Sequence, residues 1–134
     1  LLRNKKKVKF MYHDLTSPTR LPLNNNALWD LAVCFEVAEH LEEKYAPALL
    51  SKLQKSASII MMTAAEPTAQ GKRGILHYNE QTNQYWIRKM THFTNFSYDE
   101  CLTAQARNNF NSANVISYLA RPMIFVKNEV NNSL

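Results

Sequence analysis

The sequence predicts an α/β domain built on a parallel sheet, and three observations support this class. The chain has 134 residues, the size of one domain, and 46% of them are apolar, which is enough for a core. Residues 28–35 are almost continuously apolar, a pattern typical of a strand covered on both faces in a parallel sheet. The order strand, loop, strand, helix, strand favours right-handed crossovers. We therefore expect residues 1–134 to form a single domain.

Turn-forming residues and hydrophobic spacing divide the chain into elements. The segment 14–18 (DLTSP) ends the first apolar stretch, and Pro22 with Asn24–Asn26 indicates a loop. Leu49, Leu50 and Leu53 recur at helical spacing, with Pro47 in the first turn. The predicted elements are strands at 8–12, 28–35, 58–63 and 122–127 and helices at 45–53, at 85–90 and from Ser97 or Asp99 to Phe110.

Composition narrows the class of protein. The net charge of +5 comes partly from the basic segment 1–7, which is either a solvated terminus or a phosphate contact. Cys34 and Cys101 form no CxxC motif, so we expect reduced thiols and a cytoplasmic protein. No apolar run reaches the roughly 18 residues that span a bilayer, which argues against a membrane protein. Residues 128–134 are expected to form a frayed tail.

Ionisable side chains gather directly after the apolar run at 28–35. Glu36, Glu39 and His40 are spaced i, i+3 and i+4, so a helical turn would place them on one side. In parallel sheets, ligands bind beyond the carboxyl ends of the strands. Carboxylate oxygen and imidazole nitrogen suit a divalent cation, Mg²⁺ or Mn²⁺ where oxygen dominates. The alternative is an acidic turn in which His40 packs inward and the glutamates cap the next helix.

A second histidine follows the next predicted strand. The long polar loop 64–80 ends in GILHYNE and contains Pro67, Gly71 and Gly74, and loops of this length are usually functional or mobile. Adjacent strand ends would bring His77 toward the acidic cluster. His77 is thus either a fourth ligand or a hydrogen-bonded loop residue.

Three segments in order carry a resemblance to a known family. They are WDLAVCFEVAEHL at 29–41, SIIMMTAAEP at 58–67 and HYNEQTNQYWI at 77–87. They resemble the C-terminal two thirds of class I S-adenosylmethionine-dependent methyltransferases, in particular bacterial and phage members with an EVAEHL segment. The resemblance covers roughly residues 8–127 and implies a Rossmann-like sheet.

The resemblance also implies roles for individual residues. Asp14 and Leu15 match the adenine-recognition position, although Asp14 is equally typical of a plain turn. Glu36 would face the cofactor or the reacting centre. The acidic cluster with a later histidine is similar to metal-dependent O-methyltransferases, including small-RNA 2′-O-methyltransferases. By that analogy a divalent ion activates a substrate hydroxyl, and without a metal a histidine acts as general base. The ligands implied are Glu36, Glu39, His40 and His77.

The aromatic pair Tyr85–Trp86 has two interpretations. It forms an aromatic wall beside the substrate, or Trp86 packs in the core of a helix.

The departures from the family pattern are equally informative. The chain has two glycines, Gly71 and Gly74, where about nine are average, and no counterpart of the family's glycine-rich turn. We therefore expect an N-terminally truncated sheet that lacks the family's first two strands and binds S-adenosylmethionine weakly or not at all. In the family's order those strands lie between the third and fourth, so the fourth would expose an edge and favour a homo-oligomer.

Three functions are compatible with the sequence. The first is O-methylation of a small-molecule or sugar hydroxyl by the intact parent enzyme, which this chain would carry out only if it still binds the cofactor. The second is a non-catalytic α/β fragment or interaction module, which the missing glycine-rich turn favours. The third is metal-dependent RNA 2′-O-methylation. The absence of arginine–aromatic interleaving argues against a nucleic-acid partner.

Overall fold

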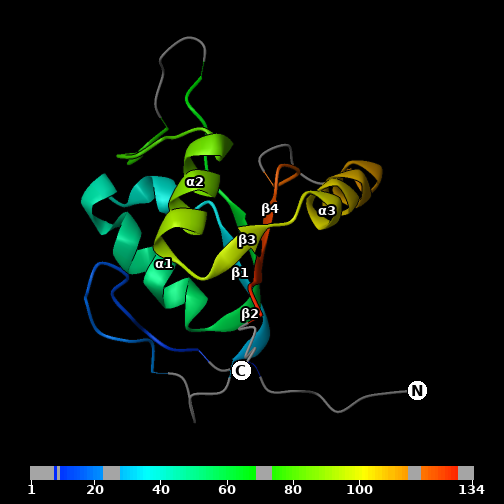
Figure 1. Cartoon of the computed structure of the whole chain (residues 1–134). Coiled ribbons are helices and arrows are strands. Elements are labelled where there is room, and N and C mark those ends of the chain that lie inside the picture. Colours follow the sequence, from blue (N-terminus) through cyan, green and yellow to red (C-terminus); the bar gives the residue numbers. More distant parts are fainter. Residues whose placement is uncertain (1–7, 9, 23–27, 69–73, 115–118, 130–134) are drawn as a thin grey trace.

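Four strands form one open sheet with helices on both sides (Figure 1). The computed structural model describes residues 8, 10–22, 28–68, 74–114 and 119–129. Helices α1 and α2 cover one face, and α3 lies on the other side beside β4. The elements are β1 (Trp29–Phe35), the short 3₁₀ turns η2 (Ala38–His40) and η3 (Glu43–Tyr45), α1 (Ala46–Gln54), β2 (Ala57–Thr63), α2 (Asn83–Phe93), β3 (Phe96–Tyr98), α3 (Glu100–Ser112) and β4 (Met123–Lys127).

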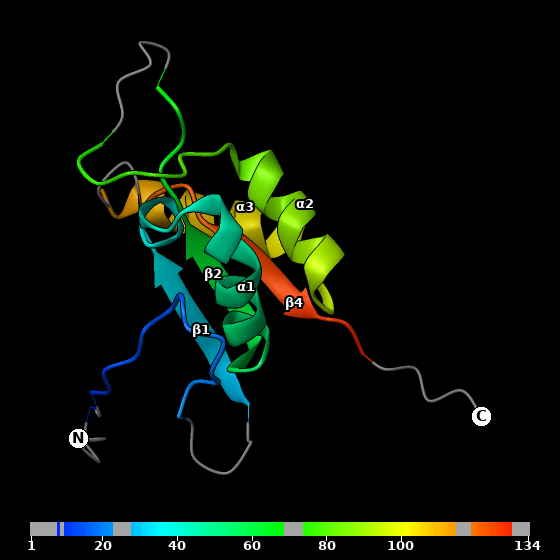
Figure 2. The same ribbon diagram turned by 90° about the vertical axis from the view of Figure 1, so that its left-hand side faces the viewer.

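The strand order is β1-β2-β4-β3, with mixed direction. β1 and β2 are parallel, with Leu31 opposite Ile59, as the sequence predicts. β4 runs antiparallel to both β2 and β3, as the opposed arrows of β2 and β4 show in Figure 2. The sheet is therefore mixed, and the expected parallel arrangement holds for the pair β1 and β2 but not for β4. An apolar run such as MIFV has the same pattern in either direction, so the sequence could not show whether β4 runs parallel or antiparallel to its neighbours.

Most predicted elements are confirmed within a few residues. α1, with Pro47 in its first turn, β2 and β4 match, and α2 extends beyond the predicted 85–90. Asp99 is the N-cap of α3, whereas Ser97 lies in β3, a three-residue strand too short to produce a periodic signal. Parts of the chain lie outside the described residues: the basic segment 1–7, the loop at Asn24–Asn26, residues 69–73 of the long loop and residues 130–134 of the tail.

The predicted strand at 8–12 is wrong. Residue 8 and residues 10–12 belong to no strand, and the side chains of Val8, Phe10 and Tyr12 are 77%, 90% and 96% exposed. Alternating apolar residues form a strand only where a neighbour supplies hydrogen bonds and a buried face. These described residues have neither.

β1 is covered on one face only, contrary to the prediction of burial on both. Cys34 points into the core, whereas Leu31 and Val33 on the opposite face are 47% and 54% exposed. α3 covers β4 but not β1, which lies at the edge of the sheet. The position of β1 at the edge agrees with the expectation that this strand has one unpaired side. The homo-oligomer stays a prediction.

The core lies between the sheet and the pair α1 and α2. Each of its large side chains contributes about 1.5–3 kcal/mol when it leaves water. Trp86 is 1% exposed, which confirms its interpretation as helix core. No helix in the described ranges combines the length and apolar content needed to cross a membrane. The largest buried apolar side chains are Leu49, Leu50, Ile60, Met62, Trp86, Met90, Phe96, Met123 and Phe125.

A buried hydroxyl joins α3 to the sheet. The Thr103 hydroxyl accepts a hydrogen bond from the backbone N–H of Ile124 in β4 at 3.0 Å. The Asp99 carboxylate caps the same helix by accepting from the Leu102 N–H at 2.8 Å. Thr103 is 2% exposed, so water cannot replace its hydroxyl.

We expect Thr103→Val to lower the free energy of unfolding by roughly 1–3 kcal/mol, because the buried Ile124 N–H loses its acceptor while the side-chain shape is kept. Urea denaturation measures this loss. Thr91→Val is the matched control, since the exposed Thr91 hydroxyl bonds only to carbonyls of its own helix. Equal losses for the two variants would contradict the role of Thr103.

Candidate metal centre

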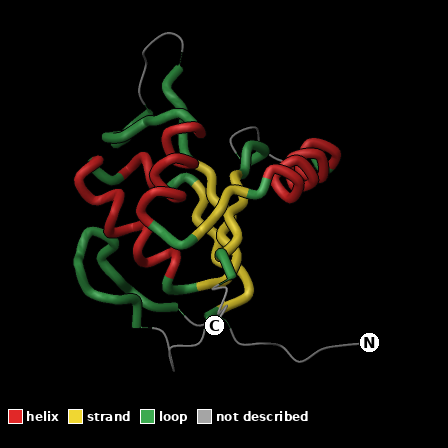
Figure 3. The backbone as a smooth tube through the Cα atoms, viewed as in Figure 1, coloured by secondary structure: helices red, strands yellow, loops and turns green. Residues whose placement is uncertain are grey.

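Loops and short turns follow the carboxyl ends of the strands (Figure 3). The segments after β1 and β2 hold four of the predicted site residues, Glu36, Glu39, His40 and His77. Glu36 follows β1 directly and has a φ of 53°, in the left-handed region. For a residue other than glycine this conformation costs about 1–2 kcal/mol. Its N–H donates to both the carbonyl and the hydroxyl oxygen of Thr63, each at 3.2 Å. Two acceptors at the end of β2 thus hold this turn.

Glu39 anchors the second loop of the site. It lies in η2, and its backbone carbonyl accepts hydrogen bonds from the N–H groups of Tyr78 and Asn79 at 2.8 and 3.0 Å. These two bonds fasten the segment carrying His77 onto the turn that carries Glu39 and His40. The predicted convergence of the two loops is therefore observed.

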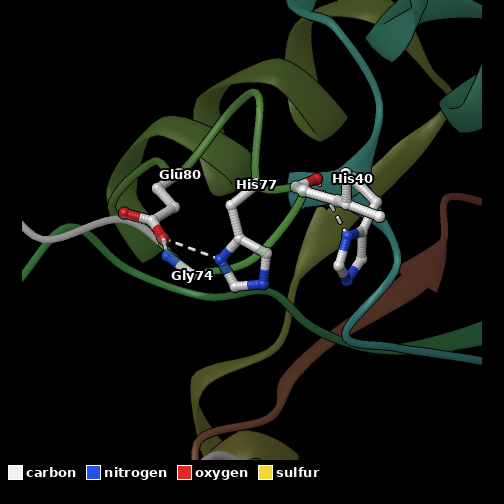
Figure 4. A network of polar contacts seen from close by, with 5 residues as sticks. His40, Gly74, His77 and Glu80 are labelled. Carbon is white, nitrogen blue, oxygen red and sulfur yellow. Dashed lines mark hydrogen bonds and ion pairs between the residues drawn. The ribbon is translucent and has the colours of Figure 1, made fainter.

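Hydrogen bonds select one tautomer at each histidine. His40 Nδ1 lies 3.1 Å from the carbonyl oxygen of Leu76, and His77 Nδ1 lies 2.7 Å from Oε1 of Glu80 (Figure 4). Carbonyl and carboxylate oxygens only accept, so in both rings Nδ1–H donates. The Nε2 lone pairs are then available to a metal, the arrangement typical of metal-binding histidines.

Gly74 is required for the position of His77. A Cβ at residue 74 would clash with the imidazole ring of His77. The Gly74 N–H also donates to Oε1 of Glu80 at 2.7 Å. Glu80 therefore orients the histidine and holds the loop at the same time.

The cluster provides a donor set for a divalent cation. One ligand atom from each of Glu39, His40 and His77 lies within 4.8 Å of the others. Ligands on one Mg²⁺ are at most about 4.2 Å apart, because each bond is about 2.1 Å long, so small side-chain shifts close the set. Both carboxylate oxygens of Glu39 and Oε1 of Glu36 are buried without a hydrogen-bond partner. Buried acceptors without donors indicate that a cation fits there.

Glu36 lies outside this set of three, but its carboxyl is close enough to Glu39 to affect the charge of the site. Burial raises the pKa of Glu36, and the nearby Glu39 carboxylate raises this pKa further. Glu36 therefore takes up a proton at a higher pH than an ordinary glutamate. A bound cation would offset this repulsion, so metal affinity should fall as Glu36 is protonated.

The remaining predicted site residues lie elsewhere. Asp14 is exposed, and its Oδ1 accepts hydrogen bonds from the N–H and hydroxyl of Thr16 at 2.8 and 2.7 Å, as in a plain turn. Leu15 packs against the core. The carbonyl of Ser17, in the same turn, accepts from Lys52 near the end of α1. The structure does not bring Asp14 and Leu15 to the metal cluster, and their role in adenine recognition stays a prediction.

Sequence reasoning missed the supporting residues. Glu80 stands three positions after His77, and this spacing was a usable signal for a carboxylate that orients the ring. The Leu76 carbonyl left no such signal, because it is a backbone atom placed by a φ of 59° at a leucine.

Cys34 lies beneath the cluster in the core. Burial raises the pKa of its thiol to about 12, and the charge of Glu39 contributes to the rise. Cys101 is exposed on α3. The two thiols should therefore differ strongly in reactivity, since the thiolate is the reactive form.

We expect iodoacetamide at pH 8 to alkylate Cys101 rapidly and to leave Cys34 unmodified, because about one Cys34 thiol in 10⁴ is ionised at that pH. Mass spectrometry after timed labelling measures this difference. In denaturant both thiols should react. Two rapidly labelled cysteines in the folded protein would contradict the burial of Cys34 under Glu39.

Comparisons with known proteins support the fold. No protein-family model matches the chain, and no curated protein matches it at a significant level. The chain is similar to the crystal structure of the small RNA methyltransferase HEN1, with a TM-score of 0.51 and 18% sequence identity. The match covers 78% of this chain and 14% of that chain. The likeness shows a mixed α/β fold with an open sheet, consistent with a Rossmann-like methyltransferase.

Proposed function

We propose that this chain forms the metal-binding, acceptor side of an S-adenosylmethionine-dependent O-methyltransferase site. The observation that carries the proposal is the pair of buried, unpartnered oxygens of Glu39 beside two histidines whose Nε2 atoms are available. Glu36, Glu39, His40 and His77 would hold Mg²⁺ or Mn²⁺. The methyltransferase fold of a solved neighbour supports the reaction class.

The geometry supports activation of a hydroxyl group. A divalent cation lowers the pKa of a hydroxyl that binds it and also fixes the position of its oxygen. His40 and His77 keep their Nδ1 protons on the Leu76 carbonyl and on Glu80, so neither ring can rotate without losing a bond. The chain's own contribution is thus to bind and orient the acceptor oxygen.

The donor side of the site has less support. S-adenosylmethionine would supply an electrophilic methyl group when bound. Asp14, the candidate for adenine recognition, uses its Oδ1 within its own turn. This observation supports a second candidate, a metal-binding module without catalysis of its own.

We expect Glu39→Gln to uncouple stability from metal binding. In EDTA the variant should be more stable than the wild type by about 1–2 kcal/mol, because a buried carboxyl group whose two oxygens have no partner costs more to bury than a neutral amide. Mn²⁺ at a hundredfold excess over its Kd should stabilise the wild type by about 2.7 kcal/mol and the variant very little. Chemical denaturation with and without Mn²⁺ measures both effects.

Glu42→Gln is the matched control, because Glu42 is an exposed carboxylate close by whose ion-pair partner, Lys44 at 2.9 Å, is also exposed. This variant should respond to Mn²⁺ as the wild type does. Equal stabilisation of Glu39→Gln and wild type by Mn²⁺ would overturn the metal site, and with it the proposed function.

The acceptor is tested on the Mn²⁺-loaded protein. The solved neighbour is a small RNA methyltransferase, so an RNA end is compared with small sugars and diols as the source of the hydroxyl. We expect a hydroxyl acceptor to lower the water-proton relaxation enhancement of bound Mn²⁺, because its oxygen displaces water. No displacement by any hydroxyl compound would contradict acceptor binding. Calorimetric titration of the same sample with S-adenosylhomocysteine decides between the enzyme and the non-catalytic module.

A further inference from the structure

A polar cavity has a lining that shares no residue with the proposed metal centre. It has a volume of about 620 Å³ and lies between the start of α2, the end of α3 and the segment before β4. Two arginines and three asparagines supply donors, and one carboxylate is present. Its polar lining residues are Glu66, Asn83, Arg107, Asn111, Asn114 and Arg121.

Arg107 is the cation of this cavity that lacks a carboxylate partner. Its Nε donates to the carbonyl oxygen of Pro122 at 3.1 Å, and the side chain is partly buried. Among the described residues it forms no ion pair. The bond to Pro122 fixes the plane of the guanidinium group. A partly desolvated guanidinium with no counter-charge favours an anion.

The single carboxylate of the cavity is already engaged. Oε1 of Glu66 accepts from the N–H of Asn83 at 3.0 Å, and Oε2 accepts from Arg121 at 3.1 Å. Arg121 is nevertheless 69% exposed in its side chain, so its other nitrogens are accessible. Two arginines and one glutamate give the lining of the cavity a net charge of +1.

The side-chain amides define the type of anion. Asn83 begins α2, Asn111 lies in the last turn of α3, and Asn114 follows it with a φ of 52°. Amide groups donate and accept, so they suit a ligand that carries hydroxyl groups together with the anion. The planar guanidinium group can donate two parallel hydrogen bonds to two oxygens of a phosphate. S-adenosylmethionine carries no phosphate.

The cavity and the metal cluster share one edge of the sheet. Glu66 stands three residues after Thr63, whose hydroxyl and carbonyl hold the Glu36 turn. Asn83 stands six residues after His77 on the same connection. Two residues of the cavity thus belong to the same β2–α2 connection that carries His77.

We propose that this cavity binds a phosphate group of the hydroxyl acceptor, with Arg107 as the main contact and Arg121 as the second. The cavity is assigned from its own residues, and only the statement that the phosphate belongs to the acceptor rests on the proposed function. The acceptor would then be a phosphorylated sugar or nucleotide.

The test is a calorimetric titration of the full chain, in EDTA and without cofactor, with ribose 5-phosphate, ribose and inorganic phosphate. We expect ribose 5-phosphate to bind most tightly, inorganic phosphate more weakly, and ribose not measurably. Arg107→Gln should weaken binding of ribose 5-phosphate by about tenfold or more, since a charged hydrogen bond is lost. Arg121→Gln, an exposed change that should not disturb folding, should weaken it about threefold.

Arg88→Gln, an exposed arginine on α2 outside the cavity, is the matched control and should leave the affinity unchanged. If Arg107→Gln, Arg121→Gln and Arg88→Gln changed the affinity for ribose 5-phosphate equally, the proposal that this cavity binds phosphate would be overturned. Equal affinity for inorganic phosphate and ribose 5-phosphate would overturn its assignment to the acceptor. Glu39→Gln should bind ribose 5-phosphate as the wild type does, so failure of the metal site and failure of the pocket are distinguishable.

Discussion

The arrangement of the candidate site depends on one backbone carbonyl, that of Glu39. It accepts two N–H groups, from Tyr78 and Asn79, and so joins loops that are almost forty positions apart. This fastening holds the His77 loop against the turn that carries Glu39 and His40. Leu76 reaches His40 only because the loop is held there, and Glu80 reaches His77 within the loop itself. Because backbone groups make the bonds, most side-chain substitutions in this region leave the fastening intact.

The electrostatics of the site oppose the stability of the metal-free fold. Glu39 is fully buried with both carboxylate oxygens unpartnered, and the backbone at Glu36 is strained. Such features persist where the surrounding structure over-determines them, and they cluster at functional sites. Here the surrounding structure is the parallel pair β1 and β2, whose ends hold the strained turn. Packing in the core therefore offsets the free-energy cost of burying the Glu39 carboxyl group away from water.

The sequence predicted the meeting of the two loops better than the sheet. The spacing of Glu39 and His40 is local, and the parallel pair of strands brought His77 to them by a general rule of topology. The direction of β4 and the pairing of β3 depend on contacts between distant segments that leave no periodic pattern. The segment at residues 8–12 shows the converse error, since its apolar residues have strand propensity but no described neighbour to pair with.

The place of β4 in the sheet has a consequence for folding. The last described strand inserts between β2 and β3, so the sheet cannot close until residues 123–127 are available. Until then one edge of β2 has no strand partner. Contacts of this sequence separation slow folding, because the chain loses the entropy of a long loop before it gains the pairing. During synthesis the metal ligands would be complete well before the strand that stabilises the sheet beneath them, so an early-bound cation would act on a partly formed fold.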